Sequence, residues 1–271
     1  MLLCFDKRFK PQVQHLITLT TDFGTRDGFV AQMKGVLLTI NPDVRLVDVT
    51  HHIEPFSILE GALVLKGLSS YYPPKTIHLA VVDPGVGGKR RAVVLDAGDQ
   101  YYVGPDNGLF SLVLTAQPLW KMREIRSKDY MLPDPHPTFH GRDLFAPTAA
   151  FLSTGKSFES VGPEVHDPVI LTVADVKIMA DHLEGEVIYV DRFGNLTTNI
   201  DVGRLNHPVG CIRVGRVEID GMSFFYDQVE EGRPLALINS FGYLEIGINR
   251  GDAAKSLGIG KGEKVHVSWT S

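Results

Sequence analysis

The sequence has few cysteines, no excess of basic charge and no long apolar runs, and each shortage excludes a class of protein. Only Cys4 and Cys211 occur among the 271 residues, so neither a disulfide framework nor a four-cysteine metal site can form. Lysine and arginine number 27 against 32 acidic residues, and no basic stripe suits a nucleic acid. No stretch reaches the roughly 18 consecutive apolar residues of a membrane span. These absences predict a cytoplasmic globular protein that handles a small molecule and binds neither nucleic acid nor membrane.

The first half of the chain alternates between strand and helix patterns. Residues 1–15 are predicted to be an N-terminal extension, and residues 16–170 an α/β domain. Strands are expected at 16–21, 44–49 and 77–82, with amphipathic helices between them; Ser57 and Glu60 match a capping box before the second helix. Strands joined by helices pair in parallel, so this domain is predicted to hold a largely parallel sheet.

After Arg91 the pattern changes. A hairpin is expected around residues 97–99, and helices over 108–114 and 143–152. Residues 183–271 then form seven short strand-like runs separated by turn residues, which predicts an antiparallel β-barrel domain.

Two of the predicted parallel strands end in an aspartate followed by a glycine-containing turn. Asp22 lies in Thr-Thr-Asp-Phe-Gly, and Asp83 begins Asp-Pro-Gly-Val-Gly-Gly-Lys-Arg. Ligands of parallel sheets bind beyond the carboxyl ends of the strands, although an aspartate there serves as a turn or helix cap as often as it serves chemistry. The glycines lack the spacing of a phosphate-binding loop, and we interpret them as a tight turn that brings Asp83 to Arg90.

Histidines close to these motifs raise the possibility of a metal site. His140 lies in a proline-interrupted segment, and His51 and His52 follow the second strand. A metal site built from these three and from Asp22 and Asp83 is one alternative, although no ligand spacing supports it.

In the second half, two polar-aromatic loops lie between strands. They are Asp-Arg-Phe-Gly-Asn at 191–195 and Asn-Ser-Phe-Gly-Tyr at 239–243. Such residues usually serve turns, but an aromatic face beside an amide is also what an adenine site needs.

Taken together, six segments in this order resemble the S-adenosyl-L-methionine (SAM) hydrolases that form adenosine. This family is also called the SAM hydroxide adenosyltransferases and is related to the SAM halogenases. The segments span the chain from about Ile17 and lie at residues 20–24, 82–87, 104–108, 139–147, 193–199 and 239–242.

The resemblance implies hydrolysis of SAM to adenosine and L-methionine by in-line attack of water or hydroxide on the 5′ carbon. It implies neither metal nor cofactor, and a homotrimer whose active sites lie between one subunit's N-terminal domain and a neighbour's C-terminal domain. The catalytic set carried over is Asp83, Arg90 and His140. Besides Asp83, the substrate-binding residues carried over are Asp22 at the ribose hydroxyls, Asn195 at the adenine edge, Asp191 and Ser240 at the methionine ammonium, and Phe241 and Glu245 nearby.

Three other functions remain open from the sequence. A halogenase is the first, although by the resemblance halogenases carry a tyrosine at the position of Asp83. A protein that binds SAM or adenosine without turning it over is the second. A metal-dependent hydrolase is the third.

Overall fold

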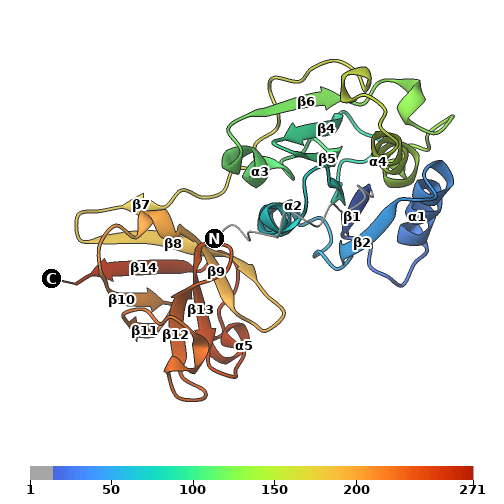
Figure 1. Ribbon diagram of the computed structural model, residues 1–271. Coiled ribbons are helices and arrows are strands. Elements are labelled where there is room, and N and C mark those ends of the chain that lie inside the picture. Colours follow the sequence, from blue (N-terminus) through green and yellow to red (C-terminus); the bar gives the residue numbers. More distant parts are fainter. Residues whose placement is uncertain (1–14, 271) are drawn as a thin grey trace, which may run out of the picture. The chain divides into compact units, whose positions relative to one another are not determined.

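The computed structural model describes residues 15–270, and the chain forms two compact units (Figure 1). The first extends to Leu171 and the second begins at Thr172. The predicted extension, residues 1–15, lies outside the described residues except for His15. Among the residues that the structure describes, no helix is both long and apolar enough to cross a membrane.

A six-stranded mixed sheet forms the centre of the first unit, in the order β2-β1-β3-β5-β4-β6. The strands β2, β1, β3 and β5 run in parallel, whereas β4 pairs with both of its neighbours in the antiparallel sense. Their bounds are β1 Leu16–Thr21, β2 Arg45–Thr50, β3 Ile77–Val81, β4 Ala92–Ala97, β5 Gln100–Pro105 and β6 Trp120–Glu124.

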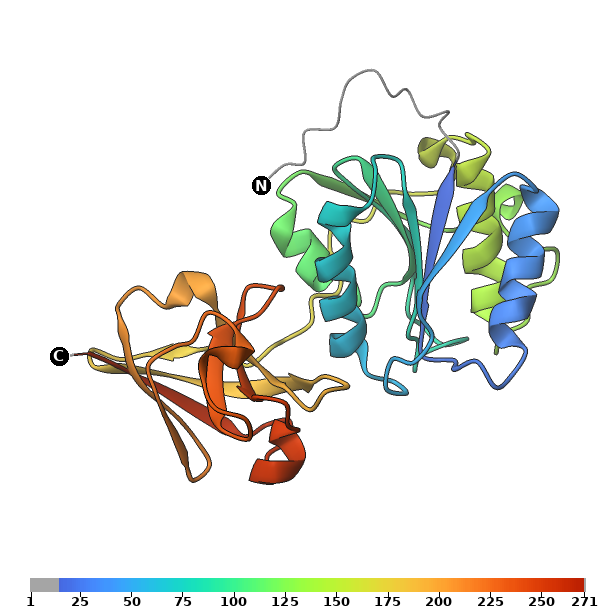
Figure 2. The same ribbon diagram turned by 60° about the horizontal axis from the view of Figure 1, so that its bottom comes forward.

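Helices cover both faces of this sheet (Figure 2). Helix α1 packs against α4 on one face, and α2 packs against α3 on the other. Side chains alternate along β3, so Leu79 and Val81 join the core under α1 and α4 whereas Ala80 joins the core under α2. Because β3 is buried on both faces of the sheet, most of its residues are apolar and do not alternate with polar ones. The helices are α1 Phe29–Ile40, α2 Ile58–Leu68, α3 Ser111–Ala116 and α4 Ala146–Ser153.

The second unit is an antiparallel barrel with strand order β11-β10-β14-β8-β9-β13-β12. The end strands β11 and β12 lie close together, so the barrel is nearly closed around one apolar core, as the sequence predicted. Strand β7 pairs with the first residues of β8. The unit also contains the short helix α5, Ala253–Leu257. The strands are β7 Lys177–Ile178, β8 His182–Val190, β9 Leu196–Asp201, β10 Val209–Val214, β11 Val217–Asp220, β12 Pro234–Ile238, β13 Tyr243–Ile248 and β14 Lys264–Trp269.

Short helical turns connect the larger elements. They are η1 Ser69–Tyr71, η2 Lys128–Tyr130, η4 Phe158–Ser160, η5 Val202–Arg204 and η6 Tyr226–Gln228, together with the π-helical turn η3 Gly141–Phe145.

Three local predictions were wrong or incomplete. Helix α2 begins after Ser57 as expected, but the Ser57 side chain makes no cap hydrogen bond, so the predicted capping box does not form. The helix expected over 143–152 is divided into η3 and α4, with Pro147 in the first turn of α4. Strand β6 was missed because Trp-Lys-Met-Arg-Glu carries three charges, as an edge strand tolerates.

Candidate functional site

A tight turn after β3 carries Asp83 toward Arg90, as the sequence predicted. The Val86 amide donates to the Asp83 carbonyl at 3.3 Å, and the Gly88 amide donates to Gly85 at 3.0 Å. Gly87 has φ +73°, and a β-carbon there would lie 2.4 Å from the carbonyl oxygen of Pro137. Only glycine therefore lets this turn contact the segment that leads to His140.

Asp83 and Arg90 form a two-pronged ion pair. Arg90 Nε donates to both carboxylate oxygens of Asp83, at 3.1 and 3.0 Å, and its terminal Nη2 donates to Oδ2 at 2.5 Å. The Asp83 and Arg90 side chains are only 4% and 10% exposed, and the guanidinium also lies 5.2 Å from the ring centre of Phe145. This pairing fixes the carboxylate in one orientation, because the planar guanidinium donates hydrogen bonds to both oxygens.

His140 completes a chain of three functional groups. Its Nδ1 lies 2.7 Å from Arg90 Nη2. A guanidinium can only donate, so Nδ1 must accept, and a neutral imidazole then carries its proton on Nε2. Burial, with the adjacent Arg90 charge, lowers the pKa of His140 below its usual value, which favours this neutral form.

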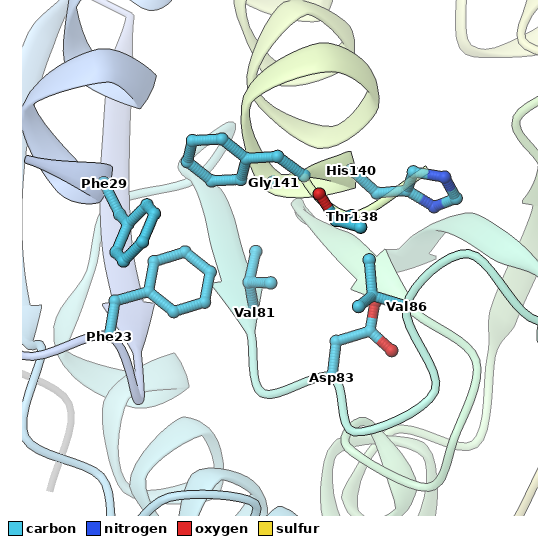
Figure 3. A pocket seen from close by; sticks show the side chains of 9 residues that line it. Phe23, Phe29, Val81, Asp83, Val86, Thr138, His140 and Gly141 are labelled. Atoms are coloured by element: carbon cyan, nitrogen blue, oxygen red, sulfur yellow. The ribbon is translucent and has the colours of Figure 1, made fainter. Parts of the chain in front are cut away.

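A largely apolar pocket opens beside Asp83 (Figure 3). Its cavity volume is about 140 Å³. The rings of Phe23, Phe29 and Phe139 form one wall, where each meets the others edge to face. Besides these rings, the lining residues are Val81, Asp83, Val86, Thr138, His140 and Gly141.

Asp22 follows β1, next to β3, so both aspartates leave the sheet at the same edge, as predicted. Its Oδ2 accepts a 2.9 Å hydrogen bond from the amide of Phe56, whose φ is +69°. Burial raises the pKa of Asp22 above its usual value, although the Phe56 hydrogen bond opposes the shift, and the Asp83 charge adds to it. The negative charges of Asp22 and Asp83 therefore repel each other.

His51 anchors the turn that bears Asp22, which sequence reasoning did not find. The imidazole is 4% exposed, with Nδ1 2.9 Å from Thr21 Oγ1 and Nε2 2.9 Å from Asp48 Oδ1. The His51 carbonyl accepts from the amide of Gly24 at 2.7 Å. Hydrogen bonds of His51 thus hold Thr21 and Gly24 on either side of Asp22, and we expect His51 to act as a positioning residue.

Replacing His51 by phenylalanine is expected to raise the KM for a ligand held by Asp22 about tenfold while changing kcat less, because the carboxylate loses its fixed position. His51→Asn keeps an acceptor or donor near Thr21 and should recover part of this loss. His78→Phe is the matched control, because His78 is buried and its Nδ1 lies 2.8 Å from Thr18 Oγ1 in the middle of the same sheet. Steady-state kinetics with melting temperatures checks this; an equal KM change in both phenylalanine variants contradicts a specific role.

The structure does not bring together the residues of the alternative metal site. Within residues 15–270, Asp22, His51, His52, Asp83 and His140 make no cluster of metal-ligand atoms. His51 is instead bonded to Thr21 and Asp48, and the Nδ1 of His140 faces Arg90.

In the second unit, the 191–195 loop folds around the Asp191 carboxylate. Its Oδ1 accepts from the amides of Phe193 and Asn195 at 2.8 Å each, and its Oδ2 accepts from Asn195 Nδ2 at 3.0 Å. Asn195 is 7% exposed, whereas Phe193 is 75% exposed. The carboxylate therefore orients the Asn195 amide.

A second group joins this loop to β13. Tyr226 donates to Glu245 Oε1 at 2.6 Å and lies 3.4 Å from Asn195 Nδ2, and Asn239 donates to Glu245 Oε2 at 3.1 Å. Burial, with the hydrogen bond and charge of Glu245, raises the pKa of the Tyr226 hydroxyl and keeps it a donor. Sequence reasoning missed Tyr226, because its partners Glu245 and Asn195 are 19 and 31 residues away along the chain. It noted Asn239 only as part of the 239–243 loop.

The predicted residues thus gather in two places. Asp22, Asp83, Arg90 and His140 lie at the carboxyl edge of the first unit's sheet. Asp191, Asn195 and Glu245 share one network in the second unit, and Ser240 and Phe241 lie in the turn between β12 and β13 of that unit.

Comparison with known proteins finds matches to both units. The family models of the SAM hydroxide adenosyltransferase N-terminal and C-terminal domains match residues 17–162 and 185–266. The chain belongs to the SAM hydroxide adenosyltransferase family. A relative named (R)-S-adenosyl-L-methionine hydrolase, from Salinispora tropica, is 40% identical over 93% of this chain and 97% of its own length.

Two further similar proteins extend the comparison. A fluorinase from Nocardia brasiliensis is 30% identical over 93% of this chain and 96% of its own length. The crystal structure of an uncharacterized conserved protein from Thermotoga maritima superimposes with a TM-score of 0.86 at 36% identity, covering 93% of this chain and 99% of that one. The fold of an α/β unit followed by a β-barrel is therefore that of a solved relative.

Proposed function

We propose that the protein hydrolyses SAM to adenosine and L-methionine. The observation that carries the proposal is the Asp83 carboxylate, held by Arg90 on the wall of an apolar pocket. This arrangement is suited to aiming a water molecule, and the relatives at 33–40% identity are named as hydrolases of this substrate.

The substrate carries its own leaving group, because the sulfonium departs as the neutral thioether of methionine without an acid. The oxygen of water forms the new bond to the 5′ carbon while the carbon–sulfur bond breaks, and its electron pair goes to sulfur. One water proton is released to solvent by way of Asp83. The contribution of the protein is to hold the water in line with the carbon–sulfur bond, roughly 3–3.5 Å from the carbon.

Arg90 and His140 support this role. Arg90 occupies one side of the Asp83 carboxylate, which leaves the remaining lone pairs for the water. His140, as a neutral acceptor for Arg90, holds the guanidinium in place without adding a second positive charge beside the cationic substrate.

The remaining predicted residues supply substrate binding by the family resemblance. Asp22 holds the ribose hydroxyls, and Asn195 meets the adenine edge. Asp191 and Ser240 hold the methionine ammonium, with Phe241 and Glu245 nearby.

The assembly is part of the same proposal. The protein is a cytoplasmic homotrimer, and each active site combines the first unit of one subunit with the second unit of a neighbour. The reaction uses no metal and no other cofactor, and the protein binds no nucleic acid.

The proposal is tested by supplying SAM, as separate sulfonium epimers, in oxygen-18 water with chelator and chloride present. We expect methionine and adenosine bearing one heavy oxygen, measured by mass spectrometry. A 5′-chloro nucleoside indicates the halogenase alternative, which the fluorinase relatives represent. Ligand retention without methionine release indicates a binding protein. Activity that the chelator abolishes indicates a metal-dependent hydrolase.

A further inference from the structure

A cluster of potential metal-ligand side chains lies on strands β8 and β14 of the barrel, and it includes none of the residues assigned above. His182 and Glu184 lie two apart on β8, so both side chains leave the same face of the sheet. His266 of β14 is paired directly opposite Glu184. One ligand atom from each of the three residues lies within 4.8 Å of the others.

Neighbouring groups already orient two of these side chains. His182 Nδ1 lies 2.8 Å from Asp181 Oδ1, which leaves its Nε2 directed toward Glu184 Oε1 at 3.9 Å. His266 Nδ1 lies 3.3 Å from the same Glu184 oxygen. A carboxylate on the far nitrogen is the usual partner of a metal-bound histidine, because it fixes the tautomer and raises the basicity of the ligand.

We propose that His182, Glu184 and His266 bind a divalent transition-metal cation of the Zn²⁺ class. Two imidazoles and one carboxylate are a donor set that zinc accepts, with a fourth position open to water. Bonds of roughly 2.0–2.1 Å in a tetrahedron place ligand atoms about 3.3 Å apart, so closure needs side-chain movement of about 1 Å. Each side chain is about one third exposed and has room to rotate.

Lys177 of β7 is expected to lower the affinity of this site for a cation. Its ammonium lies 3.7 Å from Glu184 Oε2 and neutralises part of the charge that attracts a cation. A bound cation competes with this ammonium, so removing Lys177 should strengthen metal binding.

The competing explanation is a set of ordinary cross-strand ion pairs, in which protonated histidines face Glu184. The two explanations predict opposite effects of a divalent cation, since imidazolium repels it. Only the metal site predicts saturable binding that stabilises the barrel.

The experiment is calorimetric titration of the full chain with zinc chloride at pH 7.5, paired with melting temperatures. We expect one saturable site, weakened about 10- to 100-fold by His266→Gln and by His182→Gln. Lys177→Gln should tighten binding about threefold, because a like charge at a screened surface position is removed. Zinc should raise the melting temperature of the unaltered protein but not that of His266→Gln.

His207→Gln is the matched control, because His207 is an exposed histidine of the same unit that contacts Trp269 and not the cluster. It should leave zinc affinity unchanged. Absence of saturable binding overturns the proposal, and so does binding that His266→Gln and His207→Gln weaken equally. The metal-free melting temperature of each variant shows that it is folded.

Discussion

Replacing Asp83 by alanine is expected to lower kcat/KM for SAM about a thousandfold, because the water loses the acceptor that aims it and receives its proton. The variant also leaves Arg90 without its carboxylate partner, which destabilises the fold by about 3 kcal/mol. Steady-state release of methionine, measured beside the free energy of unfolding, separates the two effects.

A neighbouring ion pair offers a matched control for this variant. Asp106 is 4% exposed and accepts a 2.7 Å hydrogen bond from Arg91 Nε, but it does not line the pocket. Asp106→Ala should cost comparable stability and leave kcat/KM within about threefold. If Asp83→Ala loses no more activity than Asp106→Ala, Asp83 has no part in the reaction.

Two inactive variants are expected to restore activity when combined. Asp83→Ala disables the first unit and Asn195→Ala the second, so each variant alone is inactive. If each site of a trimer joins one subunit's first unit to its neighbour's second unit, every mixed trimer contains one intact site of three. Coexpression with two different tags and purification over both should therefore yield about one third of the unaltered activity.

The control is a mixture of the same two proteins prepared separately and combined just before assay, which should stay inactive until subunits exchange. Light scattering gives the mass of the doubly tagged species. If the mixed trimers have no activity, each active site is formed by a single chain. If the doubly tagged species has the mass of a dimer, the protein is not a trimer.

The sequence was most informative where neighbouring residues cooperate. Asp83 and Arg90 are joined by a single glycine-rich turn, so strand ends and turn chemistry were enough to bring them together. The same reasoning put Asp22 at the same sheet edge, because β1 and β3 are adjacent and parallel.

Contacts between distant segments were harder to predict. The bonds from His51 to Thr21, and from Tyr226 to Glu245, depend on tertiary structure that periodicity does not specify. The helix expected over 143–152 showed a similar limit, since its apolar periodicity does not reveal the π turn that precedes α4. Side-chain periodicity predicts which face is buried but not the hydrogen-bond pattern of the backbone.

The contact of Gly87 with the Pro137 carbonyl limits how the protein can change its nucleophile. A β-carbon at Gly87 would push the main chains of the two segments apart, so their close approach depends on the glycine. New specificity must come from exchanging side chains that face the cavity, such as Val86 and Thr138, on a fixed backbone. Laboratory evolution toward another nucleophile should therefore accumulate substitutions at those positions and retain the glycine.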